Sequence, residues 1–277
     1  MAVIIAAAVC CVLMYVLLAA PALRSKGKGR LMGQTYYAHR GLHGNGVSEN
    51  SVAAFRLAME QEYGIELDVR LTKDNRLVVF HDDTPERLCG DRRSVREMTL
   101  KEVQRLRLPD GQGIPLFEDV LSLVQGKAPL LVEIKSHRMG DSSVAEKTWE
   151  VLKCYRGPYA VQSFDPFQLR YFKNHAKDTV RGQLARACPK GDGFSIRKMA
   201  EILAGNLMFD RISVPDYVAY QHTDTKKLCY QMMRRVFRAP LAVWTVRSEA
   251  EEEKVRHICD MVIFENYLPG KNEEEEK

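Results

Sequence analysis

Residues 65–81 of this 277-residue chain read IELDVRLTKDNRLVVFH, two apolar runs joined by a short polar segment. The polar segment is too short for a crossover helix, so the two runs predict an antiparallel hairpin. If a two-residue turn is centred between Asp74 and Asn75, Asp68 lies directly opposite His81, with their Cβ atoms about 5 Å apart. A three-residue turn would shift this register by one position and separate the pair.

Short β-branched runs alternate with amphipathic stretches along the rest of the chain. Besides the hairpin, strands are predicted at Tyr36–His39, Leu130–Ile134, Ala160–Ser163, Val180–Leu184, Arg211–Val214, Leu241–Val246 and Met261–Phe264. Alternation of strand and helix over about 240 residues implies a parallel sheet, and this length suits a closed eight-stranded barrel. The predicted fold class is therefore α/β, a single TIM (β/α)8 barrel domain over residues 35–270, in which the hairpin accounts for the ninth strand.

An apolar run opens the chain. Ala2–Ala20 contains no charged residue and no glycine, and nineteen residues at 1.5 Å rise cover about 28 Å, close to the hydrocarbon thickness of a bilayer. We therefore predict a transmembrane anchor over residues 1–22. The rival interpretation is a cleaved signal peptide, because Ala20-Pro21-Ala22 resembles a small-residue cleavage site. However, a signal peptide is expected to carry a lysine or arginine before its apolar run, and none precedes the run here.

Positive charges follow the apolar run directly. Residues 23–34 predict a basic tether, which carries Arg24, Lys26, Lys28 and Arg30. Because such charges favour the cytoplasmic side, we predict a single-pass protein of the cell membrane with its barrel in the cytoplasm. The chain ends in an acidic tail over residues 271–277, which we interpret as a solvated, frayed end.

The overall composition is that of a globular protein. Contents of 45% hydrophobic and 28% charged residues exclude wholesale disorder and fibrous repeats. The formal net charge is +5, but no basic stripe interleaved with aromatic residues appears, so nucleic acid is not the expected partner. The sequence carries no signal for a particular oligomeric state.

Charged residues stand at the ends of apolar strands, where an isolated charge is unfavourable. They are His39, Arg40, Glu66, Asp68, His81, Glu133 and Lys135. Residues two apart in a strand share a face, so Glu66 and Asp68 point the same way, as do Glu133 and Lys135. Taken singly, each is explained as a satisfied strand-end residue or a member of a surface ion pair, but seven together favour one shared site.

The residue types of this set indicate a chemistry. Three carboxylates at one barrel mouth would repel one another unless a cation lies among them, and oxygen ligands favour Mg²⁺ or Ca²⁺ over Zn²⁺. Two histidines beside such a cation suit acid–base catalysis near neutral pH. Arg40 and Lys135 supply positive charge for an anionic group, for which phosphate is the obvious candidate.

A series of motifs in fixed order resembles the glycerophosphodiester phosphodiesterases. The resemblance runs from about Tyr37 to Pro269. It rests on His39-Arg40-Gly41, Ser48-Glu49-Asn50-Ser51, Ile65-Glu66-Leu67-Asp68-Val69, Val78-Val79-Phe80-His81-Asp82, Met98-Thr99-Leu100-Lys101-Glu102, Ile114-Pro115-Leu116, Val132-Glu133-Ile134-Lys135, Ser163-Phe164-Asp165 and Trp244-Thr245-Val246.

This resemblance implies a TIM barrel and a divalent-metal hydrolase that splits a glycerophosphodiester into glycerol 3-phosphate and an alcohol. At the matching positions, it implies that Glu66, Asp68 and Glu133 are metal ligands. It makes His39 and His81 the acid–base pair and Arg40 and Lys135 the phosphate-binding residues. These roles agree with the chemistry that the residue types indicate, whereas the substrate is implied by the resemblance alone.

Three positions depart from the family pattern. Ser48 stands where proline is usual, Phe264-Glu265-Asn266 replaces the usual Thr-Asp-Pro turn, and Arg247 replaces an asparagine that often follows Trp-Thr-Val. The last two lie at the barrel rim, so they bear on substrate preference. Two alternatives therefore stay open: a lysophospholipase D acting on membrane lysophospholipids, and a catalytically weak barrel that binds phospholipid headgroups.

Overall fold

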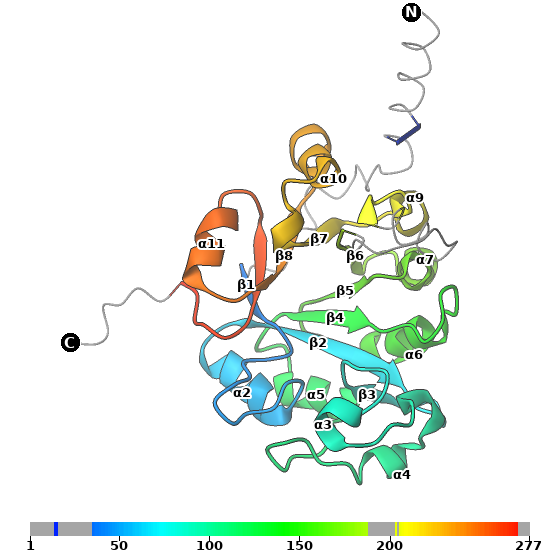
Figure 1. Ribbon diagram of the computed structural model, residues 1–277. Coiled ribbons are helices and arrows are strands. Elements are labelled where there is room, and N and C mark those ends of the chain that lie inside the picture. The colour runs from blue at the N-terminus through cyan, green and yellow to red at the C-terminus, as the bar shows by residue number, and fades with distance from the viewer. Residues whose placement is uncertain (1–13, 16–34, 188–202, 204, 271–277) are drawn as a thin grey trace, which may run out of the picture.

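A computed structural model describes residues 14–15, 35–187, 203 and 205–270 of the chain (Figure 1). Within these residues, eight parallel strands form a closed barrel, because β1 pairs with both β9 and β2, and β3 adds an antiparallel ninth strand beside β2. The predicted barrel with one extra strand is therefore confirmed. The strands are β1 (Tyr36–Ala38), β2 (Gly64–Leu71), β3 (Leu77–Val79), β4 (Leu130–Ile134), β5 (Tyr159–Ser163), β6 (Val180–Ala185), β7 (Tyr217–Gln221), β8 (Leu241–Val246) and β9 (Met261–Phe264).

The helices surround the barrel (Figure 1). Several begin at a residue whose side chain accepts a hydrogen bond from the first turn, as Ser51, Asp165 and Ser248 do for α2, α7 and α11. The helical segments are α2 (Val52–Glu60), α3 (Glu86–Cys89), η1 (Val95–Glu97), α4 (Leu100–Val103), α5 (Phe117–Val124), α6 (Ser143–Leu152), α7 (Pro166–His175), α9 (Asp210–Ser213), η2 (His222–Asp224), α10 (Leu228–Met232), η3 (Met233–Phe237) and α11 (Glu249–Val255).

Alternation along the strands divides the buried side chains into two sets. One set, which includes Leu67 and Val132, packs with helix residues outside the barrel, and the other, which includes Leu131 and Tyr217, packs inside it. Glu133 follows Leu131 by two residues and therefore lies on the inner face. Apolar side chains thus fill the lower interior, and the polar site occupies the carboxyl end of the strands, where sites of this fold lie.

The hairpin exists as predicted, but its register is wrong. Val69 pairs with Val79, and the Phe80 amide donates to the Asp68 carbonyl at 3.0 Å, so Phe80 and not His81 lies opposite Asp68. The reason is a three-residue turn that ends at Asn75, whose φ of 57° is left-handed. Such a turn is one of the common hairpin connections, and it shifts the pairing by one residue. His81 reaches the barrel mouth from the segment that follows β3.

The strand predicted at Arg211–Val214 is also wrong. Residues Asp210–Ser213 form the short helix α9, and the strand is β7, whose residues Val218 and Ala219 are fully buried between β6 and β8. Val214 ends the helix in a left-handed conformation. Both runs contain β-branched residues, and burial in the sheet, which the local sequence does not reveal, selects the second one.

The predicted anchor, tether and tail lie almost wholly outside the described residues. Met14 and Tyr15 are the exception, and the Tyr15 hydroxyl donates to the Asn206 carbonyl at 3.1 Å. Among the described residues, no helix combines the length and the apolar character that a membrane span needs.

One glycine links the barrel packing to the site. A Cβ at Gly182 would overlap the Tyr217 ring, whose hydroxyl donates to Gln162, which in turn donates to Glu66. We therefore expect Gly182→Ala to lower the free energy of unfolding by about 1–3 kcal/mol, as overpacking does in other cores. Chemical denaturation measures this change. In the control Gly113→Ala the added methyl meets nothing closer than 3.8 Å, so an equal loss there would contradict the explanation.

Candidate active site

Three carboxylates converge inside the barrel mouth. Glu66 and Asp68 come from β2 and Glu133 from the neighbouring β4, where Asp68 pairs with Glu133 across the two strands. They are 1%, 1% and 6% exposed, and one oxygen of each lies within 4.8 Å of the others. The structure thus brings together the three residues that the sequence predicts as metal ligands.

Burial and mutual repulsion set the protonation of this carboxylate cluster. Desolvation, followed by the charges of Asp68 and Glu133, raises the pKa of Glu66 well above its ordinary value. Desolvation also raises the pKa of Glu133, although Lys135 opposes the shift. At Asp68 desolvation is outweighed by the positive charges of Lys135 and Arg40 and by the hydrogen bond from Asn50, so its pKa is lowered. Asp68 is thus the most readily ionised of the three carboxyl groups.

Two cations lie against the carboxylate cluster. The Lys135 ammonium lies 2.6 Å from Glu133 Oε1 and 3.1 Å from Asp68 Oδ1, and Arg40 Nε lies 3.6 Å from Asp68 Oδ2. The Arg40 backbone N–H also donates to Glu66 Oε2 at 3.0 Å. Burial lowers the pKa of Lys135, but Asp68 and Glu133 together raise it above its ordinary value, so the ammonium stays charged.

The donor set fits a hard divalent cation. All three candidate ligands are carboxylates, two of them have raised pKa values that a nearby cation would lower, and Asp68 Oδ1 has no partner other than the Lys135 ammonium. Lys135 and Arg40 offset only part of the charge, because Arg40 is shared with Glu49. Oxygen donors alone favour Mg²⁺ or Ca²⁺ over softer metals.

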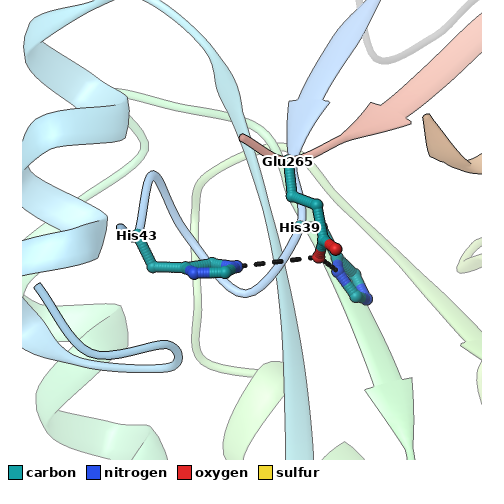
Figure 2. A group of neighbouring side chains, drawn as sticks. All are labelled: His39, His43 and Glu265. Atoms are coloured by element: carbon teal, nitrogen blue, oxygen red, sulfur yellow. Dashed lines mark hydrogen bonds and ion pairs between the residues drawn. The ribbon is translucent and has the colours of Figure 1, made fainter. Parts of the chain in front are cut away.

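His39 is held by a carboxylate that the sequence analysis did not select. Its Nδ1 lies 2.6 Å from Glu265 Oε2, at the end of β9 (Figure 2). Arg247 Nε lies 2.6 Å from the other Glu265 oxygen. Burial would raise the pKa of Glu265, but the hydrogen bond from His39 and the charge of Arg247 lower it well below its ordinary value. Because Glu265 is ionised, Nδ1 must carry the proton, and the Nε2 lone pair of neutral His39 is free.

His81 has its own carboxylate partner. Its Nδ1 lies 2.7 Å from Asp82 Oδ1. Burial, aided by the charges of Lys135 and Arg40 and opposed by Asp68, lowers the pKa of His81 to about 4. His81 is therefore a neutral imidazole at neutral pH in this structure.

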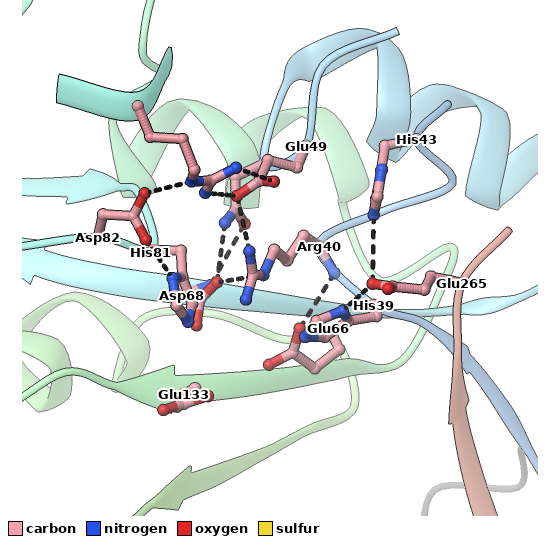
Figure 3. A network of polar contacts seen from close by, with 12 residues as sticks. His39, Arg40, His43, Glu49, Glu66, Asp68, His81, Asp82, Glu133 and Glu265 are labelled. Carbon is pink, nitrogen blue, oxygen red and sulfur yellow. Dashed lines mark hydrogen bonds and ion pairs between the residues drawn. The ribbon is translucent and has the colours of Figure 1, made fainter. Parts of the chain in front are cut away.

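A chain of hydrogen-bonded ion pairs connects His81 to Arg40. Asp82 accepts from Arg87 at 2.7 Å, Arg87 donates to Glu49 at 2.6 Å, and Glu49 accepts from Arg40 at 2.7 Å (Figure 3). This chain links the Arg40 and His81 side chains through Asp82, Arg87 and Glu49. Glu49 and Asp82 lie inside motifs that the sequence analysis quotes, so a signal for them was present.

The site opens into a cavity of about 400 Å³. His39, His81, Arg40 and Lys135 line it together with Glu66 and Glu133. An apolar and cationic part of its wall is formed by Phe164, Leu184, Trp244, Ile263, Arg186 and Arg247. An anionic group bound beside the carboxylate cluster would therefore have an aromatic and cationic surface next to it.

Comparisons with known proteins point to one family. A family model described as the glycerophosphoryl diester phosphodiesterase family matches residues 39–266. A glycerophosphodiester phosphodiesterase of Caldanaerobacter subterraneus subsp. tengcongensis is 39% identical over 158 residues, which span 53% of this chain and 65% of that protein, just under two thirds. A crystal structure of the glycerophosphodiester phosphodiesterase of Thermotoga maritima superposes with a TM-score of 0.65 and 26% identity, covering 83% of this chain and 94% of that chain.

A second solved structure shares the fold. It is an Oleispira antarctica phosphodiesterase in complex with the product sn-glycerol-3-phosphate, with a TM-score of 0.69, 21% identity and coverage of 84% of this chain and 93% of that chain.

Proposed function

We propose that this chain, which belongs to the glycerophosphoryl diester phosphodiesterase family, hydrolyses a glycerophosphodiester to glycerol 3-phosphate and an alcohol. The observation that carries the proposal is the convergence, around one cavity, of three buried carboxylates, two histidines and two cations. The product named for the Oleispira antarctica protein supports the choice of substrate class.

Glu66, Asp68 and Glu133 would hold a divalent cation, Mg²⁺ or Ca²⁺. When bound, it supplies Lewis acidity that offsets the charge of the phosphoryl oxygens. Arg40 and Lys135 bind the phosphate, because both line the cavity and carry fixed positive charge.

His39 and His81 act as the acid–base pair. One imidazole takes the proton of the attacking group, and the other gives a proton to the oxygen of the departing alcohol. Both histidines are neutral in this structure, and the negative charge of a bound diester favours the imidazolium form that one of them needs. Glu265 and Asp82 orient the two rings through their Nδ1 atoms.

Release of glycerol 3-phosphate from glycerophosphocholine tests the proposal. We expect purified full-length protein with Mg²⁺ or Ca²⁺ to form this product, and exhaustive chelation with EDTA to abolish the reaction. Activity that survives chelation would remove the cation from the proposal. Headgroup affinity without any turnover would support instead the headgroup-binding barrel.

A second substrate class is favoured by the apolar wall of the cavity. Phe164 is 38% exposed, and its ring lies edge-to-face with Trp244 at 5.5 Å between centroids. Such a surface suits the hydrocarbon of a lysophospholipid, which would make the protein a lysophospholipase D. Comparing turnover of glycerophosphocholine with that of lysophosphatidylcholine distinguishes the two substrate classes. If the apolar wall binds the acyl chain, lysophosphatidylcholine should be hydrolysed faster than glycerophosphocholine.

We also propose that residues 1–22 anchor the protein in the cell membrane, with the basic residues 23–34 and the barrel in the cytoplasm. The uncharged run Ala2–Ala20 and the positive charges after it support this orientation. Recovery of the full-length chain in a carbonate-washed membrane fraction, and cleavage of its barrel by protease only after cell lysis, are the expected results. Full recovery in the soluble fraction would contradict them.

Cation affinity should depend on pH. Because the pKa values of Glu66 and Glu133 are raised, these groups retain protons to a higher pH than free carboxylates, and a cation must displace those protons. We expect calorimetric Mg²⁺ affinity to fall as the pH is lowered, starting at a higher pH than for free carboxylates, by up to about tenfold per pH unit for each displaced proton. Affinity that is constant down to pH 5 would show that the carboxylates are ionised throughout.

A further inference from the structure

We propose that His39, His43 and Glu265 form a second metal site, selective for a borderline transition metal such as Zn²⁺, and that its occupation inhibits the hydrolysis. The three residues come from the end of β1, the loop after it and the end of β9, so the site joins two adjacent strand ends. In Figure 2 the two imidazole rings approach the same end of the Glu265 carboxylate. Metal binding rests on this geometry, whereas the inhibition rests also on the proposed function.

The ligand atoms are spaced for a small cation. Glu265 Oε2 lies 2.6 Å from His39 Nδ1 and 3.7 Å from His43 Nε2, and one atom from each residue lies within 4.8 Å of the others. Zn–N and Zn–O bonds of 2.0–2.2 Å in a tetrahedral site place ligand atoms about 3.3 Å apart. The two measured distances fall on either side of this value, so shifts of less than 1 Å would complete the arrangement.

His43 supplies an independent observation. Its Nε2 is buried, points at Glu265 and makes no hydrogen bond, which is an unfavourable arrangement for a buried polar atom. A metal would bind its lone pair. Glu265 is also prepared as a ligand, since its second oxygen accepts from Arg247 at 2.6 Å, and ligating carboxylates are typically hydrogen-bonded in this way.

The two clusters differ in donor chemistry. Glu66, Asp68 and Glu133 offer oxygen alone, whereas the second site offers two imidazole nitrogens and one carboxylate, a set that suits zinc and other transition metals. Mg²⁺ and Ca²⁺ prefer oxygen ligands, so high concentrations of them would fill the first site and leave the second one to zinc.

Zinc at the second site would change the tautomer of His39. The metal takes the Nδ1 lone pair, so the proton that Nδ1 carried moves to Nε2, and the ring stays neutral. The Nε2 lone pair is then lost, so His39 can no longer take up a proton, which either role in the acid–base pair requires. Zinc would therefore inhibit without displacing the cation of the carboxylate cluster.

Calorimetric titration with Zn²⁺ tests the binding. Full-length protein saturated with millimolar Mg²⁺ should still bind one Zn²⁺, and His43→Gln should weaken this binding at least about tenfold, the lower end of the loss seen when even a supporting residue is removed. The control is His175→Gln, because His175 is exposed and stacks on Tyr171 away from the site. Equal zinc affinity in wild type and His43→Gln would overturn the proposal. Undiminished zinc affinity in a second variant, His43→Asn, would overturn it as well.

Turnover with zinc present tests the inhibition. Without zinc, His43→Gln should match the wild-type rate, which also shows that the variant is folded. With zinc, wild type and His175→Gln should be inhibited at concentrations about tenfold or more below those that inhibit His43→Gln, and further Mg²⁺ should not relieve the inhibition. Relief by Mg²⁺ would mean that zinc competes at the carboxylate cluster and would overturn the proposal. If no protein turns over at all, the proposed function fails while the calorimetric result still decides the metal site.

Discussion

Substituting His39 by alanine is expected to lower kcat by about 10²–10⁴ while leaving Mg²⁺ affinity nearly unchanged. His39 contacts Glu265 through Nδ1, and its Nε2 is free. It does not belong to the carboxylate cluster of Glu66, Asp68 and Glu133, which is the candidate Mg²⁺ site. His81→Ala should lose activity in the same range, because His81 is the second imidazole of the cavity. Steady-state turnover at saturating metal, with calorimetry for the metal, measures both quantities.

Glu265→Gln provides a graded comparison for His39→Ala. The amide keeps the size of the side chain but removes the charge that fixes the Nδ1 proton, so kcat should fall less than in His39→Ala and the pH profile should shift. His175→Ala is the control with unchanged activity. Full activity in His39→Ala would exclude the imidazole from the reaction, whereas loss of Mg²⁺ binding in the same variant would contradict the division between histidines and carboxylates.

Glu66→Gln is expected to weaken Mg²⁺ binding by at least about 10–100-fold, since removing even a residue that only supports a ligand has an effect of this size. Activity at limiting metal should fall in proportion and should recover partly at high metal concentration, because the amide retains one oxygen. Glu133→Gln should behave in the same way. Turnover as a function of Mg²⁺ concentration measures the effect.

The control for the two glutamate variants is Glu118→Gln. Glu118 pairs with Arg76 outside the cavity, so its substitution should leave the metal dependence unchanged. If His39→Ala and Glu66→Gln responded alike to added metal, the assignment of separate roles would be wrong.

The features that the sequence predicted correctly depend on local pattern. Strand and helix periodicity, together with the length, was sufficient for the barrel, and charges at strand ends selected residues such as Glu133 that the barrel brings together. Two local errors arose where neighbouring possibilities have nearly the same propensity. Asn75, with its left-handed φ of 57°, suits turns of two and of three residues, and only the observed pairing of Leu71 with Leu77 distinguishes them.

Contacts between distant segments could not be predicted from one sequence. Glu265 and Arg247 each stand where the sequence resemblance implies another residue, and taken singly each is expected at the barrel rim. In the structure they contact each other at 2.6 Å, and Glu265 contacts His39, 226 positions away in the chain. The two departures therefore form one unit beside an acid–base residue. Gln162, which donates to Glu66, and Tyr217, which donates to Gln162, had no motif to mark them.

The chain of ion pairs from Asp82 to Arg40 affects which loops can be exchanged independently of one another. Glu49 belongs to the loop after β1, whereas Asp82 and Arg87 belong to the excursion that follows β3, so two segments with no common strand share one set of contacts. A chimaera that replaces residues 82–98 and loses Arg87 would leave Glu49 with Arg40 as its remaining arginine partner and Asp82 without its contact to this loop. The two loops are therefore best exchanged together, as a single cassette.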